Sequence, residues 1–326
     1  MKVINVTPGL LPIPPNGWGA VEKVIWDYHL QLQANNISSE IKYLNEINYD
    51  DSMIVHVHVA NLANECYQKG IPYIFTIHDH HAYLYGKDSD VFRENLKAIE
   101  NSVFSLSPCK YLVPYFGSKK LRYFSHAVNT DVFKLNDRAR HNKLKLLCVA
   151  NNGYAYNQSI DRKGFGLAIQ AAMDLDLPLT IAGPSNNNNF FKTLDPKLNN
   201  YSNLTKLYDL DEKWLVNLYN EHDAFVHLSE LEAGHPNLTL LEAMACGIPV
   251  IVMEDSPKNC EFVDESQAGI ICTPHPQAIR NQVEFLKNNG YQIYFNNIGE
   301  NGFLISGTGG VAASINEIHY LASAEL

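Results

Sequence analysis

The loop and helix at residues 230–246 carry the first candidate chemistry. A segment with Glu, Gly, Pro and Asn leads into a predicted helix over 239–246, where Thr239 is followed three residues later by Glu242. This is the spacing of a capping box, in which each side chain satisfies an unpaired backbone amide. A helix N-terminus can also bind a phosphate, and a carboxylate in its first turn can accept hydrogen bonds from the ribose of the same ligand. This stretch alone leaves both interpretations open.

A second candidate loop, residues 8–19, is rich in Pro and Gly and lies between a predicted strand and a predicted helix. Gly17 and Gly19 would let the backbone approach a ligand closely, just before a helix N-terminus. The spacing does not fit the dinucleotide-binding fingerprint G-x-G-x-x-G, because Glu22 stands where the third glycine belongs. The loop by itself is therefore a weak signal of ligand binding.

Several histidines raise the question of a metal site. His56 and His58 share one face of a predicted strand, and His78, His80 and His81 follow the next strand. Zinc needs a fixed set of ligands in tetrahedral geometry, and nothing in the spacing brings these side chains together. We expect the strand histidines to be core residues, the loop histidines to line a cleft, and no metal to bind.

Composition limits the class of protein. The 326 residues are 46% hydrophobic and 18% charged, which is typical of a globular protein with room for two domains. The net charge of -10 argues against a nucleic-acid partner and gives no support to broad docking on anionic lipid. The six cysteines contain no CxxC pair, which indicates buried free thiols in a reducing compartment.

The N-terminus resembles a strand rather than a leader sequence. Residues 1–6 lack a basic segment followed by a long apolar one, and no stretch approaches the roughly 20 apolar residues of a membrane span. We therefore expect a cytoplasmic protein with at most peripheral membrane contact.

Strands alternate with helices along the whole chain, which predicts an α/β protein with mostly parallel, doubly wound sheets. The predicted strands are 3–7, 41–44, 53–59, 73–77, 103–106, 121–124, 144–150, 179–182, 204–207, 224–228, 249–253 and 269–272. The predicted helices are 21–32, 61–69, 90–102, 164–173, 211–220, 239–246, 276–288 and 311–321, with a solvated loop at 186–189.

The pattern of strand, loop and helix begins again half-way along the chain. A polar segment at 129–142 is the predicted linker, so that the domains are 1–138 and 139–309, followed by a C-terminal helix in 310–326. Two such domains facing each other form a cleft, and the carboxyl-end loops of both sheets would face into it.

Five segments, in the expected order, resemble those of the retaining nucleotide-sugar glycosyltransferases of the GT-B fold, family 4 type (glycosyl transferases group 1). The similarity covers nearly the whole chain. The segments are 17–22 (an N-terminal glycine loop), 76–79 (a histidine loop), 123–133 (the end of the first domain), 149–165 (a phosphate loop ending in Arg162-Lys163-Gly164-Phe165) and 241–251 (the most characteristic segment).

The resemblance implies two Rossmann-like domains, the first on the acceptor side and the second binding the donor, with the last helix crossing back to the first. The donor would be a UDP- or GDP-type nucleotide-sugar, and the acceptor a glycan, lipid-linked or protein-linked hydroxyl, with no cofactor. Glu242 would bind the ribose, Lys163 the diphosphate and His78 the donor sugar, while the amides of Leu238 and Thr239 would meet the phosphate. Donor contacts are also expected from Gly17, Gly19, Gly234, His235 and Asn237.

Two positions depart from the family pattern. The family usually has a second Glu eight residues before Glu242, where this chain has Gly234, so we expect Glu232 to take that role from two residues away. The family also usually has an Arg at the position of Asn151. Whether Arg162 replaces that charge, or the lysine next to it acts alone, stays open.

The implied reaction is departure of a nucleoside diphosphate from a sugar carbon with retention of configuration. The acceptor hydroxyl would attack from the face that the phosphate leaves, a phosphate oxygen would take its proton, and neither Glu232 nor Glu242 is assigned as a nucleophile. Two alternatives remain: an epimerase-like enzyme of the same fold, and a non-catalytic nucleotide-sugar binder, which Asn151 and the displaced Glu would fit.

Overall fold

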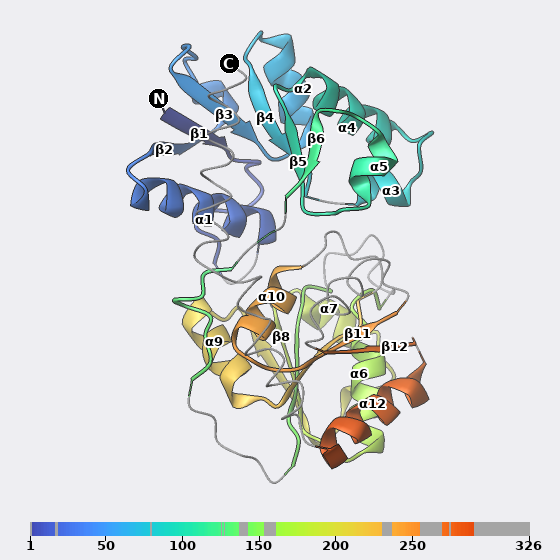
Figure 1. Cartoon of the computed structure of the whole chain (residues 1–326). Helices are drawn as coiled ribbons and strands as arrows, with labels where there is room; N and C mark the ends of the chain where they lie inside the picture. Colours follow the sequence, from blue (N-terminus) through green and yellow to red (C-terminus); the bar gives the residue numbers. More distant parts are fainter. Residues whose placement is uncertain are drawn as a thin grey trace.

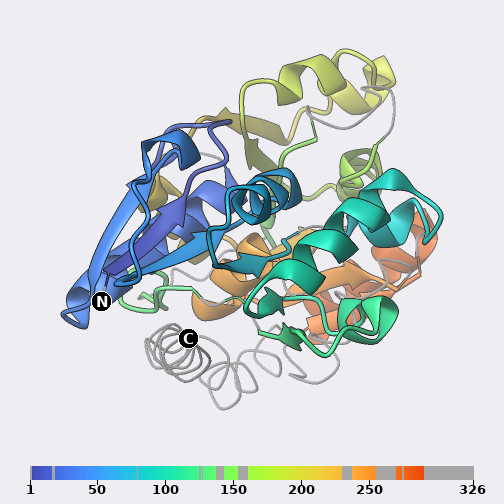
Figure 2. The same ribbon diagram turned by 90° about the horizontal axis from the view of Figure 1, so that it is seen from above.

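The computed structural model describes residues 2–16, 19–78, 80–124, 126, 128–136, 143–152, 161–229, 237–254, 269–273 and 275–289. The described chain forms two α/β domains, stacked one above the other in Figure 1. Seen from above, the first domain overlies the second (Figure 2). Among the described residues, no helix combines the length and the apolar run that a membrane span requires.

The first domain is built on a parallel sheet of six strands in the order β2-β1-β3-β4-β5-β6. Its strands are β1 (Lys2–Val6), β2 (Ser38–Lys42), β3 (Met53–Val57), β4 (Tyr73–Thr76), β5 (Ser105–Ser107) and β6 (Leu121–Tyr123). Its helices are α1 (Ala20–Ala34), η1 (Leu44–Glu46), α2 (Ala60–Gln68), α3 (His81–Leu84), α4 (Asp90–Asn101) and α5 (Leu112–Phe116).

The second domain repeats this plan with the order β12-β11-β10-β7-β8-β9, again all parallel. Its strands are β7 (Leu146–Val149), β8 (Leu179–Gly183), β9 (Leu204–Tyr208), β10 (Ala224–His227), β11 (Val250–Met253) and β12 (Gly269–Cys272). Its helices are α6 (Phe165–Asp174), α7 (Asn187–Phe191), α8 (Pro196–Asn199), α9 (Glu212–Glu221), α10 (Leu238–Ala245) and α12 (Pro276–Asn289).

Both sheets are covered by helices on both faces, because alternate strand residues point to opposite sides. In the first sheet, Ile54 packs with α1 while its neighbour Val55 packs with α2 and α4. In the second, Leu146 packs with α6 and α12, and Leu147 packs with α9 and α10. This alternation explains the continuous apolar strands of the sequence.

Each sheet has one point at which the chain reverses its direction of travel across the strands. In the first sheet this switch point lies between β1 and β3, and in the second between β7 and β10. Ligands of open α/β sheets bind outside the carboxyl ends of the strands at such a point. The loops that leave β1, β3, β7 and β10 are therefore where a site is expected.

The domains meet through α1 of the first domain and the helices α9 and α10 of the second, as Figure 1 shows. Leu238, the first residue of α10, packs against the apolar cores of both domains. Val128 and Phe133, which follow the first sheet in the chain, pack into the core of the second domain. The connecting segment is thus anchored on the second domain.

The structure confirms all the predicted strands, with ends that shift by at most three residues, and the α/β class of both domains. The predicted solvated loop at 186–189 is wrong: Asn187 to Phe191 form α7, and Asn187 is buried. Cys66, Cys109, Cys148, Cys246 and Cys272 are buried free thiols, as predicted. The sixth cysteine and the predicted helix at 311–321 lie outside the described residues.

Candidate functional site

The N-terminus of α10 begins one residue earlier than predicted and has a different cap. Asn237 is the N-cap, and its Oδ1 accepts hydrogen bonds from the backbone amides of Thr239 (3.0 Å) and Leu240 (3.4 Å) and from the Thr239 hydroxyl (2.7 Å). The predicted capping box of Thr239 and Glu242 is therefore wrong, since Asn237, a preferred cap residue, already occupies that place. The Thr239 amide is therefore bonded to Asn237.

Glu242 lies in the second turn of α10 and is only 7% exposed. Its Oε2 accepts a hydrogen bond of 2.8 Å from the hydroxyl of Tyr219 on α9. Burial raises the pKa of Glu242 to about 7, and the Tyr219 hydrogen bond and the Lys23 ammonium oppose this rise. A buried carboxylate without a paired cation is costly, which sets Glu242 apart from an ordinary surface helix residue.

Residues 150–152 and 161–164, the described parts of the connection between β7 and α6, position Arg162 and Lys163. The Asp161 carboxylate accepts hydrogen bonds from the amides of Phe165 (2.9 Å) and Gly166 (2.6 Å), and from the Asn152 side chain (3.0 Å). Burial raises the pKa of Asp161, and these hydrogen bonds oppose the rise. The Lys163 amide in turn donates to the Asn152 side chain at 3.2 Å. The loop is thus fixed at the switch point of the second sheet.

Gly164 brings this loop against the end of β10. Its φ is +67°, and a Cβ at this position would lie 2.4 Å from the Leu228 carbonyl oxygen and 2.6 Å from the Leu228 Cβ. The Ser229 hydroxyl also donates to the Arg162 carbonyl at 3.4 Å. Only glycine allows this close approach, so the phosphate-loop segment and the strand before α10 are held together.

The other side of the loop is braced by α7. The Asn152 amide donates to Asn187 Oδ1 at 2.7 Å, and Asn187 Nδ2 donates to the Ala150 carbonyl at 2.9 Å. Asn151, the position where the family has an Arg, therefore lies between two residues that Asn187 fixes.

Sequence reasoning missed Asn187 and Asp161. A run of asparagines gave no sign of burial, and Asp161 lies three residues before Gly164, the N-cap of α6, so its hydrogen bonds with the amides of Phe165 and Gly166 did not follow from cap spacing.

Four histidines of the first domain form a stack of rings. The ring centroids of His56 and His58 are 4.2 Å apart, those of His58 and His78 5.2 Å, and those of His78 and His126 5.5 Å. His58 Nδ1 lies 2.9 Å from His78 Nε2, and His56 Nε2 lies 2.8 Å from the Thr76 hydroxyl. His78 thus reaches the carboxyl-end side of the sheet from the strand beside the switch point.

Burial keeps three of these imidazoles neutral. It lowers the pKa of His56 to about 3 and of His126 to about 4, and the pKa of His58 well below its usual value. Among the residues that the structure describes, no group of three or more His, Cys, Asp or Glu side chains comes together as a metal site. His56 and His58 are therefore neutral rings that take part in hydrogen bonds.

An ion pair crosses between the domains close to Glu242. Lys23 Nζ on α1 lies 3.0 Å from Glu212 Oε2 on α9, and it also binds the Asp27 carboxylate at 2.5 Å and 2.7 Å. Gly19, with φ +122°, is the N-cap of the same α1. The glycine loop of the first domain therefore leads into the helix that faces α9 and α10.

The described structure brings some predicted site residues together. Five of them surround the carboxyl ends of β7 and β10: Asn151, Arg162, Lys163, Asn237 and Glu242. Two others, Gly19 and His78, follow strands of the facing domain. Gly17, Glu232, Gly234 and His235 lie outside the described residues, so their roles stay predictions.

Comparison with known proteins adds to this geometry. Residues 154–304, just under half of the chain, match the profile of the family described as Glycosyl transferases group 1. No curated protein sequence matches the chain.

Solved structures resemble the whole chain. A sucrose-phosphate synthase from Thermosynechococcus elongatus has a TM-score of 0.81 at 13% identity, covering 100% of both chains. Anabaena HepE, solved with UDP and glucose, has a TM-score of 0.74 at 12% identity, covering 99% of this chain and 100% of the other. A glycosyltransferase from Rickettsia africae has a TM-score of 0.72 at 14% identity, covering 99% and 98%.

The chain has the GT-B fold. The two facing six-stranded sheets and these neighbours establish the architecture, and the match of 154–304 supports a glycosyltransferase. In this GT-B protein the matched segment contains α6, α10, Arg162, Lys163 and Glu242.

Proposed function

We propose that this GT-B protein is a retaining, metal-independent glycosyltransferase that moves a sugar from a UDP- or GDP-sugar to a hydroxyl of a glycan, lipid or other acceptor. The observation that carries the proposal is the arrangement at the second switch point. There the Lys163 loop, the N-terminus of α10 and the buried Glu242 gather outside the carboxyl ends of β7 and β10. A cytoplasmic location is part of the proposal.

Each part of this arrangement suits one part of a nucleotide-sugar. The positive end of the α10 dipole and the Lys163 ammonium suit a diphosphate, on which charge grows as the sugar leaves. The Glu242 carboxylate suits ribose hydroxyls. For the α10 amides to meet the phosphate, the Asn237 side chain would have to release the Thr239 amide, which it holds at 3.0 Å.

The neighbours favour a uridine nucleotide as the first donor to test. Anabaena HepE was solved with UDP and with UDP-glucose. The experiment is a thermal-shift screen of UDP, GDP, UDP-glucose and GDP-mannose, followed by an assay of diphosphate release with candidate acceptors. Ligand binding to the native state raises the melting temperature by mass action.

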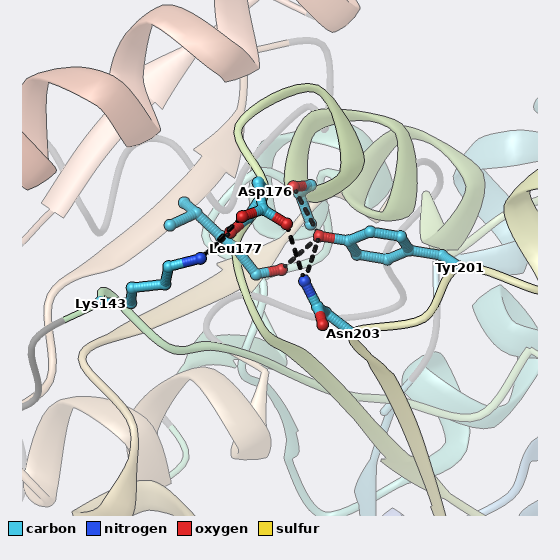
Figure 3. A network of polar contacts seen from close by, with 6 residues as sticks. Lys143, Asp176, Leu177, Tyr201 and Asn203 are labelled. Atoms are coloured by element: carbon cyan, nitrogen blue, oxygen red, sulfur yellow. Dashed lines mark hydrogen bonds and ion pairs between the residues drawn. The ribbon is translucent and has the colours of Figure 1, made fainter.

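A substitution tests the role of the phosphate loop. We expect Lys163→Ala to slow turnover by at least about a hundredfold, because the leaving phosphate would lose a fixed cation. Lys143→Ala is the control, since Lys143 binds the Asp176 carboxylate at 2.6 Å at the opposite, amino-end edge of the same sheet (Figure 3). Near-normal turnover in Lys163→Ala would overturn the role of Lys163. Nucleotide binding without diphosphate release would favour a non-catalytic binder.

A further inference from the structure

Tyr219 is a fully buried tyrosine that no known property of the site accounts for. Its side chain is 0% exposed, and its ring packs edge-on against Phe133 (6.2 Å) and Phe225 (5.8 Å). A phenylalanine would fill this apolar space equally well. The hydroxyl instead points to Glu242 and donates to its Oε2 at 2.8 Å.

This hydrogen bond changes what Glu242 can do. An ionised carboxylate accepts hydrogen bonds about twice as strongly as a neutral group, and the tyrosine hydroxyl favours the ionised form. With Oε2 held by Tyr219, the orientation of the carboxyl group is fixed, and Oε1 has no hydrogen-bond donor among the described residues. An oriented oxygen at the start of α10 is well placed to accept from a ligand hydroxyl.

We propose that Tyr219 is a positioning residue for nucleotide recognition: its hydroxyl locks the Glu242 carboxylate so that the other oxygen accepts a hydrogen bond from a ribose hydroxyl. This inference rests on the proposed function. It adds a residue from α9, outside the loops that leave the strands, and it predicts that discrimination for ribose depends on a side chain that never touches the ligand.

The charged and titratable groups around this pair come from α1, α9 and the end of α10. Lys23 and Asp27 on α1 and Glu212 on α9 act on Glu242, and Cys246, the residue after α10, acts on Tyr219. Lys23 favours the ionised Glu242, whereas the two acidic groups oppose it. Since burial already raises the pKa of Glu242 to about 7, loss of the Tyr219 hydrogen bond should raise it further.

The test measures the ribose discrimination ratio, which is the dissociation constant of a deoxy nucleotide divided by that of the ribonucleotide. Titration calorimetry is performed with UDP, 2′-deoxy-UDP and 3′-deoxy-UDP, and with the corresponding GDP set. We expect Tyr219→Phe to lower the larger of the two ratios by about fivefold to tenfold. Effects on phosphate ionisation cancel in the ratio, so its pH dependence reports on Glu242.

The pH profile separates positioning from packing. In the wild type the ratio should rise as the pH increases through about 7, and in Tyr219→Phe this rise should move to higher pH. Glu242→Gln should give a low ratio that does not depend on pH, and adding Tyr219→Phe to it should change the ratio no further. A further fall of the ratio when Tyr219→Phe is added to Glu242→Gln would overturn the proposal, and this comparison does not need the single variant Tyr219→Phe.

Tyr201→Phe is the matched control in the same domain. The Tyr201 hydroxyl donates to the carbonyls of Ala172 (3.1 Å) and Leu177 (2.9 Å), at the amino-end edge of the sheet (Figure 3). Loss of the Tyr201 hydroxyl should lower the free energy of unfolding and leave the ribose discrimination ratio unchanged. Equal weakening of ribo- and deoxynucleotides by Tyr219→Phe would show a purely structural role and overturn the proposal. If the wild type bound neither UDP nor GDP, the proposed function itself would fall, and this inference with it.

Discussion

His58 and His78 share one hydrogen bond, of 2.9 Å between His58 Nδ1 and His78 Nε2. The other ring nitrogen of His58, Nε2, is buried and has no hydrogen-bond partner among the described residues. A buried N–H without an acceptor is costlier than a bare nitrogen. His58 therefore carries its proton on Nδ1 and donates it, which fixes the orientation of the His78 ring.

This relationship predicts that His58→Leu slows sugar transfer although His58 itself is buried. Loss of a hydrogen bond worth about 1.4 kcal/mol corresponds to about a tenfold fall in kcat/KM. The control is His56→Leu, a buried histidine of the same strand that binds Thr76 instead. Equal rates in the two variants would contradict the positioning of His78 by His58. Nitrogen-15 NMR should show His58 protonated at Nδ1.

Because of Glu242, the free energy of unfolding of the protein without added nucleotide should fall as the pH rises. Its folded pKa is raised to about 7, above the 4.5 of an unfolded chain, so the native state holds the proton more tightly. Stability linked to Glu242 is then complete below about pH 4.5 and is lost as the pH rises through about 7. We expect Glu242→Gln to match the wild type at pH 4 and to exceed it at pH 8 by about 2–4 kcal/mol.

Urea unfolding of both proteins at a series of pH values measures this difference. Glu242→Gln should at the same time bind nucleotide more weakly, because it replaces the carboxylate by a neutral amide. If the wild type were as stable as the variant at pH 8, ionisation of the buried Glu242 would not destabilise the native protein.

Gly164→Ala should damage the phosphate loop. The new Cβ would lie 2.4 Å from the Leu228 carbonyl oxygen in a backbone with φ +67°, so we expect a loss of about 2–4 kcal/mol of unfolding free energy. Gly117→Ala is matched in φ, also +67°, but its nearest atom is 4.0 Å away, which leaves only the conformational cost of about 1–2 kcal/mol. Similar losses in both variants would mean that contact with β10 is unimportant.

Asn187→Ala should destabilise the second domain by about 2–4 kcal/mol, since it leaves the buried Asn152 amide and the Ala150 carbonyl without this partner. Asn188→Ala, one residue along the same helix, removes only an exposed contact with the Tyr208 hydroxyl. That control should change stability by less than about 1 kcal/mol. Chemical denaturation measures both, and a mild effect of Asn187→Ala would contradict the brace.

Periodicity was enough to predict the strands and long helices, because buried parallel strands are continuous apolar runs and surface helices repeat their apolar positions. The switch points followed from strand order, which sequence spacing does not encode. The cap of α10 was missed because Thr239 and Asn237 are both good N-cap residues, and backbone geometry at Asn237 decided between them. Asn187 was missed because its burial depends on a partner far away in sequence, Asn152.

The Tyr219–Glu242 contact could not be predicted for the same reason. Tyr219 belongs to a helix that was predicted correctly. Which side of α9 lies against α10 is set by the packing of the apolar core that the two helices share. Residue types could suggest that Glu242 binds a ligand, yet only the three-dimensional structure shows that Tyr219 holds its carboxyl group.

Leu238 touches the apolar cores of both domains at the residue where α10 begins. Any rotation of one domain against the other that keeps this contact must have its axis close to Leu238. The proposed phosphate end of the ligand would then sit near the axis and move little. His78, in the loop that follows β4 further across the first sheet, would travel along an arc, so that opening and closing would change access to the sugar while the nucleotide stays held.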